Sequence, residues 1–371
     1  MGIKKVYIEP TTRCNLTCSM CPRNTWEQEP MGDMDLDMFA QLIEQIRRIP
    51  TVETIFFGGI AEPMSHPDIL TMVSMAKETG ARVELISNGM LLNEEKIEGL
   101  LKAGLDMLWV SVDREHRESQ EELSGEKDSY EQMIRNLFSF RMKRPRIQPG
   151  AELGITFVAT KSNIRELPEI MNIGSHLGAS EIKVSNLIPY TRDMQKEVLY
   201  NRTMSCGAMK EESRLFRKKL ISMPIMDFEL LPPEVLHAVL RGWPQVQLGK
   251  NKIIRDAGYC KFIEEDSLYV RWDGEVSPCM AMLHTNKTYL QNVERLVRHH
   301  SFGNILQEEL GDIWHKEEYA CFRERVRDFA FSPCTICGIC EYAESNQEDC
   351  FGNEAPTCGA CLWSEGFFQC P

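Results

Sequence analysis

The chain of 371 residues contains no apolar run long enough to cross a membrane, so we expect no membrane association. It also lacks an excess of basic residues. The net charge of -13 disfavours a surface that follows the phosphates of nucleic acid, and we expect no nucleic-acid partner. No period of 20–50 residues repeats along the chain, which excludes a repeat array. The hydrophobic content of 43% and charged content of 26% are typical of a globular protein.

Histidine is scarce, and the eight histidines are poor candidates for metal ligands. No pair has the helical spacing, with an acid between, that binds zinc in hydrolases. His66 precedes Pro67 in a predicted loop, and His299 and His300 lie in a charged stretch. We therefore expect the histidines to be surface residues with satisfied hydrogen bonds.

Cysteine, in contrast, is abundant, with fourteen residues. Near the N-terminus, Lys4 and Lys5 lead at once into a short strand pattern and Glu9, which does not fit a secretory signal peptide. We therefore expect a reducing, cytoplasmic compartment. In such a compartment spaced cysteines bind metals more often than they form disulfides. Three of them stand near the N-terminus, and most of the others lie from Cys260 onward.

The first cysteine group has the spacing C-x3-C-x2-C and consists of Cys14, Cys18 and Cys21. A structural zinc site needs four ligands, so three thiolates do not close one. An iron-sulfur cluster held by three thiolates instead keeps one iron open for a ligand that is not protein. Residues 6–9 predict a strand and residues 11–22 the loop after it, a usual place for ligands in α/β folds. Part of a zinc knuckle, or three buried apolar thiols, are the alternatives.

Short strand patterns alternate with longer helical patterns up to about residue 185. This alternation predicts an α/β fold with a parallel sheet and right-handed crossovers. Glycines follow three of the helical patterns, where C-caps are expected. The predicted strands are 6–9, 54–57, 82–86, 107–112, 152–157 and 181–185, and the predicted helices are 36–47, 69–78, 94–102, 129–143 and 165–177. Six strands predict an open, partial barrel with room for a bulky substrate.

The residues from Val6 to Pro22, VYIEPTTRCNLTCSMCP, resemble the signature of the radical S-adenosylmethionine (SAM) enzymes. This resemblance implies a 4Fe-4S cluster on the three cysteines, with SAM chelating the open iron through its amino and carboxylate groups. It also implies a partial (β/α)6 TIM-like barrel, in agreement with the strand pattern.

The loop after the second predicted strand contains Gly58, Gly59 and Glu62. Two glycines allow the backbone to approach a ligand closely. The loop resembles the glycine-glycine-glutamate motif of the family, which holds the SAM amino group. A tight turn with a helix-capping acid is the alternative.

Polar residues also end other predicted strands. The resemblance implies that Ser87 and Ser111 contact the SAM ribose or carboxylate, and that Asn186 contacts the adenosine. Turn and N-cap chemistry is the alternative for each of them. Many relatives also carry an arginine after the position of Ser111, but Leu123-Ser124-Gly125 stands there. Arg114 or Arg117 could replace it, because a guanidinium binds a carboxylate with two hydrogen bonds.

The late cysteines form a second array. Asp273-Gly274 predicts a hairpin turn that places Cys279 just past its second strand. With residues 303–323, this array resembles the SPASM extension of radical SAM enzymes, which carries two auxiliary 4Fe-4S clusters. Two fully ligated clusters need eight thiolates, and nine are available: Cys260, Cys279, Cys334, Cys337, Cys340, Cys350, Cys358, Cys361 and Cys370.

The spacing of this array departs from the usual extension, because no cysteine follows soon after Cys260. Cys358 or Cys361 is the candidate replacement, and the assignment of each thiol to a cluster stays open. Cys206 and Cys321 fall outside the pattern, and we expect both to be buried single thiols. Two zinc ribbons are the alternative, since C-x2-C pairs also fit them.

Residues 349–371 resemble the radical SAM maturases associated with tungsten-cofactor oxidoreductases of the aldehyde:ferredoxin oxidoreductase type. We expect a radical SAM barrel in residues 1–190, a bridging helical region in 191–255 and a SPASM-type auxiliary cluster domain in 256–371. The resemblance implies a maturase that is reduced by ferredoxin or flavodoxin. It would cleave SAM to a 5'-deoxyadenosyl radical, which takes hydrogen from a substrate linked to the tungsten enzyme: its cofactor, the protein or a small peptide.

Two alternatives to this function remain at the level of the sequence. The first is a peptide or sulfatase maturase. The sulfatase form is disfavoured, because Met280 stands where those enzymes carry an acid. A non-catalytic electron-transfer protein with three clusters would need no SAM pocket. No catalytic side chain is assigned by the sequence.

Overall fold

The computed structural model describes residues 2–113, 129–200, 220–224, 226–227, 230–235, 245–248, 260–290, 292–335, 340–364, 367–368 and 371. In these residues a ten-stranded sheet has the order β10-β9-β1-β2-β3-β4-β5-β6-β7-β8. Its strands are β1 (Lys5–Ile8), β2 (Thr54–Phe57), β3 (Arg82–Ser87), β4 (Met107–Ser111), β5 (Glu152–Ala159), β6 (Glu181–Asn186), β7 (Leu220–Met223), β8 (Gln245–Leu248), β9 (Ser267–Val270) and β10 (Val276–Ser277).

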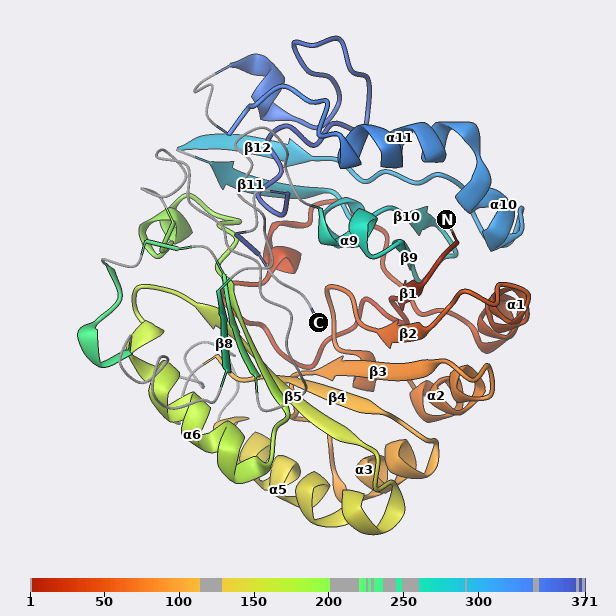
Figure 1. The fold of residues 1–371 in the computed structure, drawn as a ribbon, viewed down its shortest axis with the longest axis vertical. Helices are drawn as coiled ribbons and strands as arrows, with labels where there is room; N and C mark the ends of the chain where they lie inside the picture. The colour runs from red at the N-terminus through yellow and green to blue at the C-terminus, as the bar shows by residue number, and fades with distance from the viewer. Residues whose placement is uncertain are drawn as a thin grey trace.

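All neighbouring strands of this sheet are parallel except β10, which runs antiparallel to β9 at one edge. The sheet curves into an open barrel, and helices cover its outer face (Figure 1). These helices are α1 (Leu36–Arg47), α2 (Ile69–Lys77), α3 (Glu94–Lys102), α5 (Ser129–Ile147) and α6 (Leu167–Leu177). The predicted partial barrel is thereby confirmed.

Local signals explain where these helices begin and end. Asp35 caps α1 by accepting a hydrogen bond from the Met38 amide at 2.7 Å, and Asn93 caps α3 in the same way. Gly178 ends α6 in the left-handed conformation, with φ of +69°. The bounds of α1 and α3 agree with the prediction, and the other predicted helices differ by a few residues at their ends.

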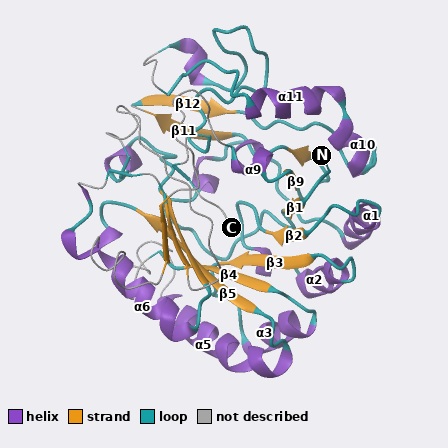
Figure 2. Cartoon of the chain, viewed as in Figure 1, coloured by secondary structure: helices purple, strands orange, loops and turns teal. Residues whose placement is uncertain are grey.

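The C-terminal part consists largely of loops with short elements (Figure 2). It contains α9 (Lys261–Glu264), α10 (Leu310–His315) and α11 (Glu317–Arg327). Strands β11 (Asn286–Leu290) and β12 (Val293–Val297) form a separate antiparallel pair. Short 3-10 helices occur along the whole chain: η1 (Pro22–Thr25), η2 (Pro63–Ser65), η3 (Ile164–Glu166), η4 (Asp193–Lys196), η6 (Met280–Met282) and η7 (Glu341–Glu344).

Two features of the sheet differ from the prediction. Residues 191–255 were expected to be helical, but 220–223 and 245–248 form β7 and β8, which continue the parallel sheet beyond β6. At the opposite edge β9, from the cysteine-rich part, pairs in parallel with β1. The predicted hairpin turn is confirmed, since Gly274 has φ of +86° between β9 and β10. Strands of four residues carry too little pattern to reveal partners that lie far away in the sequence.

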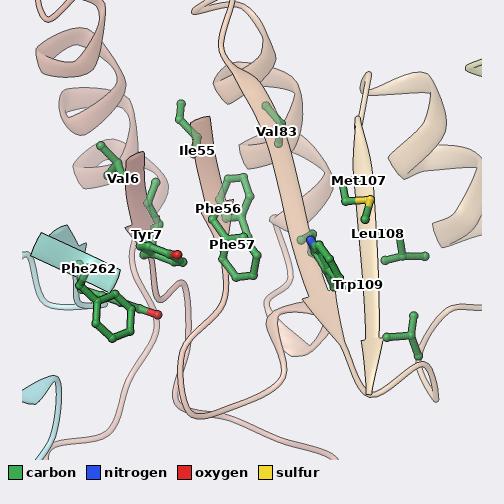
Figure 3. Close-up of a cluster of buried hydrophobic side chains, with 14 of the residues drawn as sticks. Val6, Tyr7, Ile55, Phe56, Phe57, Val83, Met107, Leu108, Trp109 and Phe262 are labelled. Carbon is green, nitrogen blue, oxygen red and sulfur yellow. The ribbon is translucent and has the colours of Figure 1, made fainter. Parts of the chain in front are cut away.

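Large side chains fill the inside of the barrel at the level of its strands. Tyr7 stacks on Tyr269 with ring centroids 4.5 Å apart, and Phe56 lies 5.1 Å from Tyr7. Trp109 occupies the same interior, and a Cβ on Gly154 would come within 2.3 Å of its ring. Figure 3 shows Tyr7 and Phe56 on the neighbouring strands β1 and β2, and Trp109 on β4, beyond β3. Because this level is filled, ligands must bind at the carboxyl ends of the strands. Among the described residues, no helix is long and apolar enough to span a membrane.

Candidate functional site

The loop after β1 carries the first three cysteines and is closed at its base by hydrogen bonds. Thr11 Oγ1 donates to Asp33 at 2.5 Å, and the amide and hydroxyl of Thr12 bond to the Gly32 carbonyl at 3.0 and 3.2 Å. Within the loop, the Leu16 amide donates to the Cys14 sulfur at 3.4 Å. Closing the base in this way brings three cysteines into one short, partly exposed turn.

The three thiols share a half-buried environment. Burial raises the pKa of each of them, and raises that of Cys18 to about 12 with help from the charges of Asp113, Cys21 and Cys14. The charge of Glu62 also raises the pKa of Cys14. The cysteines therefore lie close to one another and to the rims of β2 and β4, as expected for ligands of one centre.

Glu62 is 2% exposed and uses both carboxylate oxygens. One accepts from the Met64 amide at 2.9 Å and caps η2, and the other accepts from the Asn88 amide at 2.7 Å. Burial raises the pKa of Glu62. The capping role is therefore present, and it leaves room for a ligand, because a carboxylate has about four lone-pair sites.

The two glycines before Glu62 are required by close contacts. A Cβ on Gly58 would come within 2.5 Å of the Phe56 ring. Gly59 has φ of +145°, and a Cβ there would lie 2.7 Å from the Glu9 carboxylate. Gly59 is therefore required by its backbone conformation, and a side chain at Gly58 would need the Phe56 ring to move.

The serines predicted to contact SAM lie on the same rim and bond locally. Ser87 Oγ accepts from the Gly89 amide at 3.0 Å, and Ser111 Oγ donates to Asp113 at 3.0 Å. Asn88, which the sequence did not single out, contacts the cysteine loop. Its side-chain amide donates to Asn15 Oδ1 at 2.9 Å and approaches the Cys14 sulfur at 3.9 Å. The position of Asn88 directly after Ser87, at the end of a predicted strand, was the sequence signal that could have identified it.

Asn186 lies at the end of β6 and is 2% exposed. Its amide donates to the carbonyl of Phe367 at 2.8 Å, and Tyr7 inside the barrel donates to the carbonyl of Pro371 at 2.9 Å. Phe367 and Pro371 therefore lie at the barrel, where Figure 1 places the C-terminus. Arg114 and Arg117, the candidate carboxylate ligands, lie outside the described residues.

Electrostatic interactions relate six of the late cysteines in two sets, and Arg295 faces thiols of both, Cys334 in one and Cys358 and Cys361 in the other. The first set is Cys260, Cys279, Cys358 and Cys361. Burial raises the pKa of the first three thiols, and the charges of the other thiols in the set raise it further. Cys334 interacts instead with Cys350. Every described cysteine is a free thiol. Cys206, Cys337 and Cys370 lie outside the described residues. Cys321 was expected to be buried, but it is exposed.

The expectation of surface histidines is wrong at two positions. His66 is 3% exposed and accepts from the Asp68 amide at 3.1 Å, while its other nitrogen lies 2.8 Å from the Met34 carbonyl. His284 is fully buried between the carboxylates of Glu9 and Glu29. These two acids lie more than 250 residues before His284 in the sequence, so no local pattern could reveal the contact.

Comparisons with known proteins agree with this geometry. Residues 8–169 match the Radical SAM superfamily, and residues 260–341 match SPASM, the iron-sulfur cluster-binding domain. A "Tungsten-containing aldehyde ferredoxin oxidoreductase cofactor-modifying protein" of Pyrococcus furiosus is 31% identical over 374 residues, which cover 100% of this chain and 97% of that protein. The chain belongs to the radical SAM enzymes. It carries both the SAM-dependent barrel and a SPASM iron-sulfur domain.

Other relatives of this radical SAM enzyme are more distant. An "AdoMet-dependent heme synthase" of Methanosarcina barkeri is 27% identical over 346 residues, covering 90% of this chain and 87% of that protein. Two solved structures share the fold. SuiB of Streptococcus suis, bound to SAM, covers 92% of this chain and 72% of its own, with TM-score 0.59 and 16% identity. The structure titled "Native anSMEcpe with bound AdoMet" covers 98% and 95%, with TM-score 0.59 and 14% identity.

The residues of the first loop fit a cluster of this family. Three half-buried thiols stand in one turn, a backbone amide donates to one of the sulfurs, and a buried carboxylate lies beside them. Such hydrogen bonds and burial are the means by which a protein adjusts a cluster potential. Within the described part of the chain, no three Cys, His, Asp or Glu side chains are arranged to hold a single metal ion.

An apolar pocket lies between the barrel mouth and the SPASM domain of the radical SAM enzyme. Ile60 contributes to it from the loop after β2, and Ile188 and Tyr190 from the loop after β6. The opposite side includes Leu290 of β11 and the thiol residue Cys361. The pocket therefore lies between the loop that carries Glu62 and Cys361, one of the four interacting thiols.

Proposed function

We propose that this radical SAM enzyme is a maturase that acts on a substrate linked to a tungsten-containing oxidoreductase. The substrate is the tungsten cofactor, the oxidoreductase itself or a small peptide. The similarity to the Pyrococcus furiosus protein supports this proposal, because it extends over nearly the whole of both chains. The apolar pocket carries the proposal, since its lining includes Ile60, from the loop that also carries Glu62, and Cys361, one of the four interacting thiols.

The chain supplies binding and orientation for this chemistry. When bound to Cys14, Cys18 and Cys21, the 4Fe-4S cluster supplies the electron that cleaves SAM to methionine and a 5'-deoxyadenosyl radical. Glu62 accepts from the SAM amino group, and the glycines before it allow the close approach. Apolar walls around the pocket exclude water, which protects a reactive radical from side reactions.

Three remaining SAM contacts are part of the same proposal. Ser87 and Ser111 contact the ribose or carboxylate from the ends of β3 and β4, and Asn186 contacts the adenosine from the end of β6. The side-chain amide of Asn186 also donates to the Phe367 carbonyl, so in this proposal Phe367 forms part of the wall around the adenosine.

Two auxiliary 4Fe-4S clusters complete the enzyme. The first has the four interacting thiols Cys260, Cys279, Cys358 and Cys361 as ligands, which supports Cys358 and Cys361 as the replacement for the missing early cysteine. The second has Cys334 and Cys350, together with Cys337 and Cys340. This division leaves Cys370 as the spare thiol.

A ferredoxin or flavodoxin is the proposed electron donor. A hollow is lined by Arg13, Cys14 and Lys96. Arg13 is paired with Asp33, so Lys96 supplies the cationic charge beside one of the cluster cysteines. An acidic electron carrier fits such a surface, because complementary charges increase association rates.

A peptide-modifying enzyme is the second candidate. A "PqqA peptide cyclase" of Gluconobacter oxydans is 28% identical over 178 residues, covering 48% of this chain. The pocket also suits an apolar peptide side chain, because Ile60, Met282 and Leu290 are among the residues that line it. In this case the substrate would be a peptide with no connection to tungsten.

Substrate-stimulated SAM cleavage distinguishes the candidates. The reconstituted, reduced enzyme and SAM are mixed with one candidate substrate at a time. The candidates are the tungsten oxidoreductase, its isolated cofactor, and peptides encoded beside the gene of the enzyme or of the oxidoreductase. We expect the tungsten-linked substrate to increase 5'-deoxyadenosine formation and to change in mass. Stimulation by an unrelated peptide alone would contradict the tungsten proposal and leave the radical chemistry intact.

A further inference from the structure

A buried row of acid, imidazole and acid connects the barrel to the SPASM domain. His284 Nε2 lies 2.8 Å from Glu9 Oε2 and 3.1 Å from Oε1, and Nδ1 lies 3.1 Å from Glu29 Oε2. The side chains of His284 and Glu9 are 0% exposed, and that of Glu29 is 11% exposed. Nothing in the SAM chemistry described above uses this row.

The geometry fixes the protonation of His284. A neutral imidazole has one N–H donor, whereas both of these nitrogens face carboxylate oxygens, so only the imidazolium donates to both. Burial alone lowers the pKa of His284, but Glu9 and Glu29 outweigh it and raise the pKa to about 9. Arg271, on the side of β9, opposes this effect and is itself paired with Asp273 at 2.6 Å. Arg271 also faces Glu275.

One end of the row reaches the loop from Gly58 to Glu62, called the SAM loop below. Glu9 Oε1 also accepts from the Ile60 amide at 3.2 Å, directly after the two glycines. Gly59 lies against the same carboxylate, with room for no side chain. The position of the Glu9 carboxylate therefore sets the path of the loop from Gly58 to Glu62.

The other end reaches the segment after the cysteine loop. Glu29 lies there, and the Trp26 ring covers the imidazole of His284 with centroids 4.4 Å apart. Trp26 Nε1 donates to Asn286 Oδ1 at 2.9 Å. His284 itself follows Cys279 by five residues, so the row ties together the SAM loop, the cysteine loop and the SPASM domain.

We propose that His284 is a positioning residue for SAM, which acts as an imidazolium by holding Glu9 against the Gly59–Ile60 turn while anchored to Glu29. This inference rests on the proposed SAM site. Loss of the charge leaves a neutral imidazole between the two carboxylates, which can donate to only one of them. Arg271 also faces Glu9, but its guanidinium is engaged with Asp273. A buried charge that loses its partner is unfavourable. The carboxylates then separate, and the SAM loop moves with Glu9.

The test is an equilibrium SAM titration of His284→Gln and the wild type, each reconstituted anaerobically and with its iron measured. Glutamine is neutral and cannot donate to both acids as the imidazolium does. We expect SAM affinity to fall about tenfold or more, as for other residues that orient ligands from behind, at equal iron content.

The pH dependence separates positioning from simple packing. The folded-state pKa of His284 is raised, so its contribution is complete below the ordinary value of 6.5 and is lost as pH rises through about 9. Wild-type SAM affinity should therefore fall across pH 9. In His284→Gln this step should be absent, whereas titration of the SAM amino group appears in both proteins.

Two further variants make the result specific. Glu29→Gln removes one carboxylate, so the step in SAM affinity should move to lower pH. Lys287→Gln removes the exposed pair of Lys287 with Glu27, 2.8 Å apart, which joins the same two segments. This control should keep both the wild-type affinity and the wild-type pH profile.

Each outcome decides the matter. Wild-type affinity and pH profile in His284→Gln would overturn the inference alone. If that variant fails to fold, the Glu29→Gln profile decides: an unmoved step overturns the inference, and a step at lower pH supports it. A wild type that takes up iron but does not bind SAM overturns the proposed function, and the inference with it.

Discussion

Replacing Glu62 with glutamine tests the SAM loop most sharply, because the change keeps the size of the side chain and removes its charge. Both carboxylate oxygens accept backbone amides, from Met64 at 2.9 Å and from Asn88 at 2.7 Å. Glutamine offers one carbonyl oxygen, so one of these buried amides must face an NH2 group. An unsatisfied buried donor costs about 1–3 kcal/mol of folding free energy.

The effect on SAM binding is separate from this loss of stability. If Glu62 accepts from the SAM amino group, the lost charge-assisted bond contributes about 1.5–3 kcal/mol, which lowers SAM affinity about ten- to a hundredfold. Cluster content should not change, since Glu62 is not an iron ligand. SAM titration, iron analysis and chemical denaturation of both proteins measure the three quantities.

Asp35→Ala provides the matched control. Asp35 also caps a helix through its carboxylate, with the Met38 amide at 2.7 Å, but at the start of α1. It should cost about 1 kcal/mol of stability and leave SAM affinity unchanged. Equal SAM dissociation constants for Glu62→Gln and the wild type, at equal iron content, would refute the placement of the SAM amino group and leave Glu62 as a cap.

The remaining predictions concern the clusters and the glycine turn. Changing Cys358 to alanine should lower iron by up to about four per chain, from about twelve for three cubane clusters, and leave SAM binding intact. Unchanged iron would contradict its role as a ligand. Gly59→Ala should weaken SAM binding in titrations, because its Cβ would lie 2.7 Å from the Glu9 carboxylate at a φ of +145°. Gly150→Ala, with nothing within 4 Å of the added carbon, should bind SAM as the wild type does.

The sequence predicted the parts of the fold that local patterns determine. Strands and helices of the first 190 residues carry clear periodicity and caps, such as Asp35 and Asn93, and these elements were predicted within a few residues. The pairing of β9 with β1 was missed, as were β7 and β8. The short strands β1 and β2 could be predicted because they belong to the regular alternation of strands and helices, whereas β9 pairs with a strand from the other end of the chain.

The site shows the same division between local and distant information. The cysteine spacing and the glycine turn are continuous in the sequence, so their positions on the rim could be predicted. The burial of His284 depends on Glu9 and Glu29, which come from the other end of the chain. The grouping of Cys260 and Cys279 with Cys358 and Cys361 depends on the path of the C-terminal loops in the same way.

The most direct test of the central claim is the product formed from SAM by the anaerobically reconstituted, reduced enzyme. We expect 5'-deoxyadenosine and methionine, formed slowly without substrate. A variant in which Cys14, Cys18 and Cys21 are all alanine should form none, while keeping the iron of its auxiliary clusters. Formation of S-adenosylhomocysteine with a methylated product, or equal cleavage by the variant, would contradict a radical mechanism at these three cysteines.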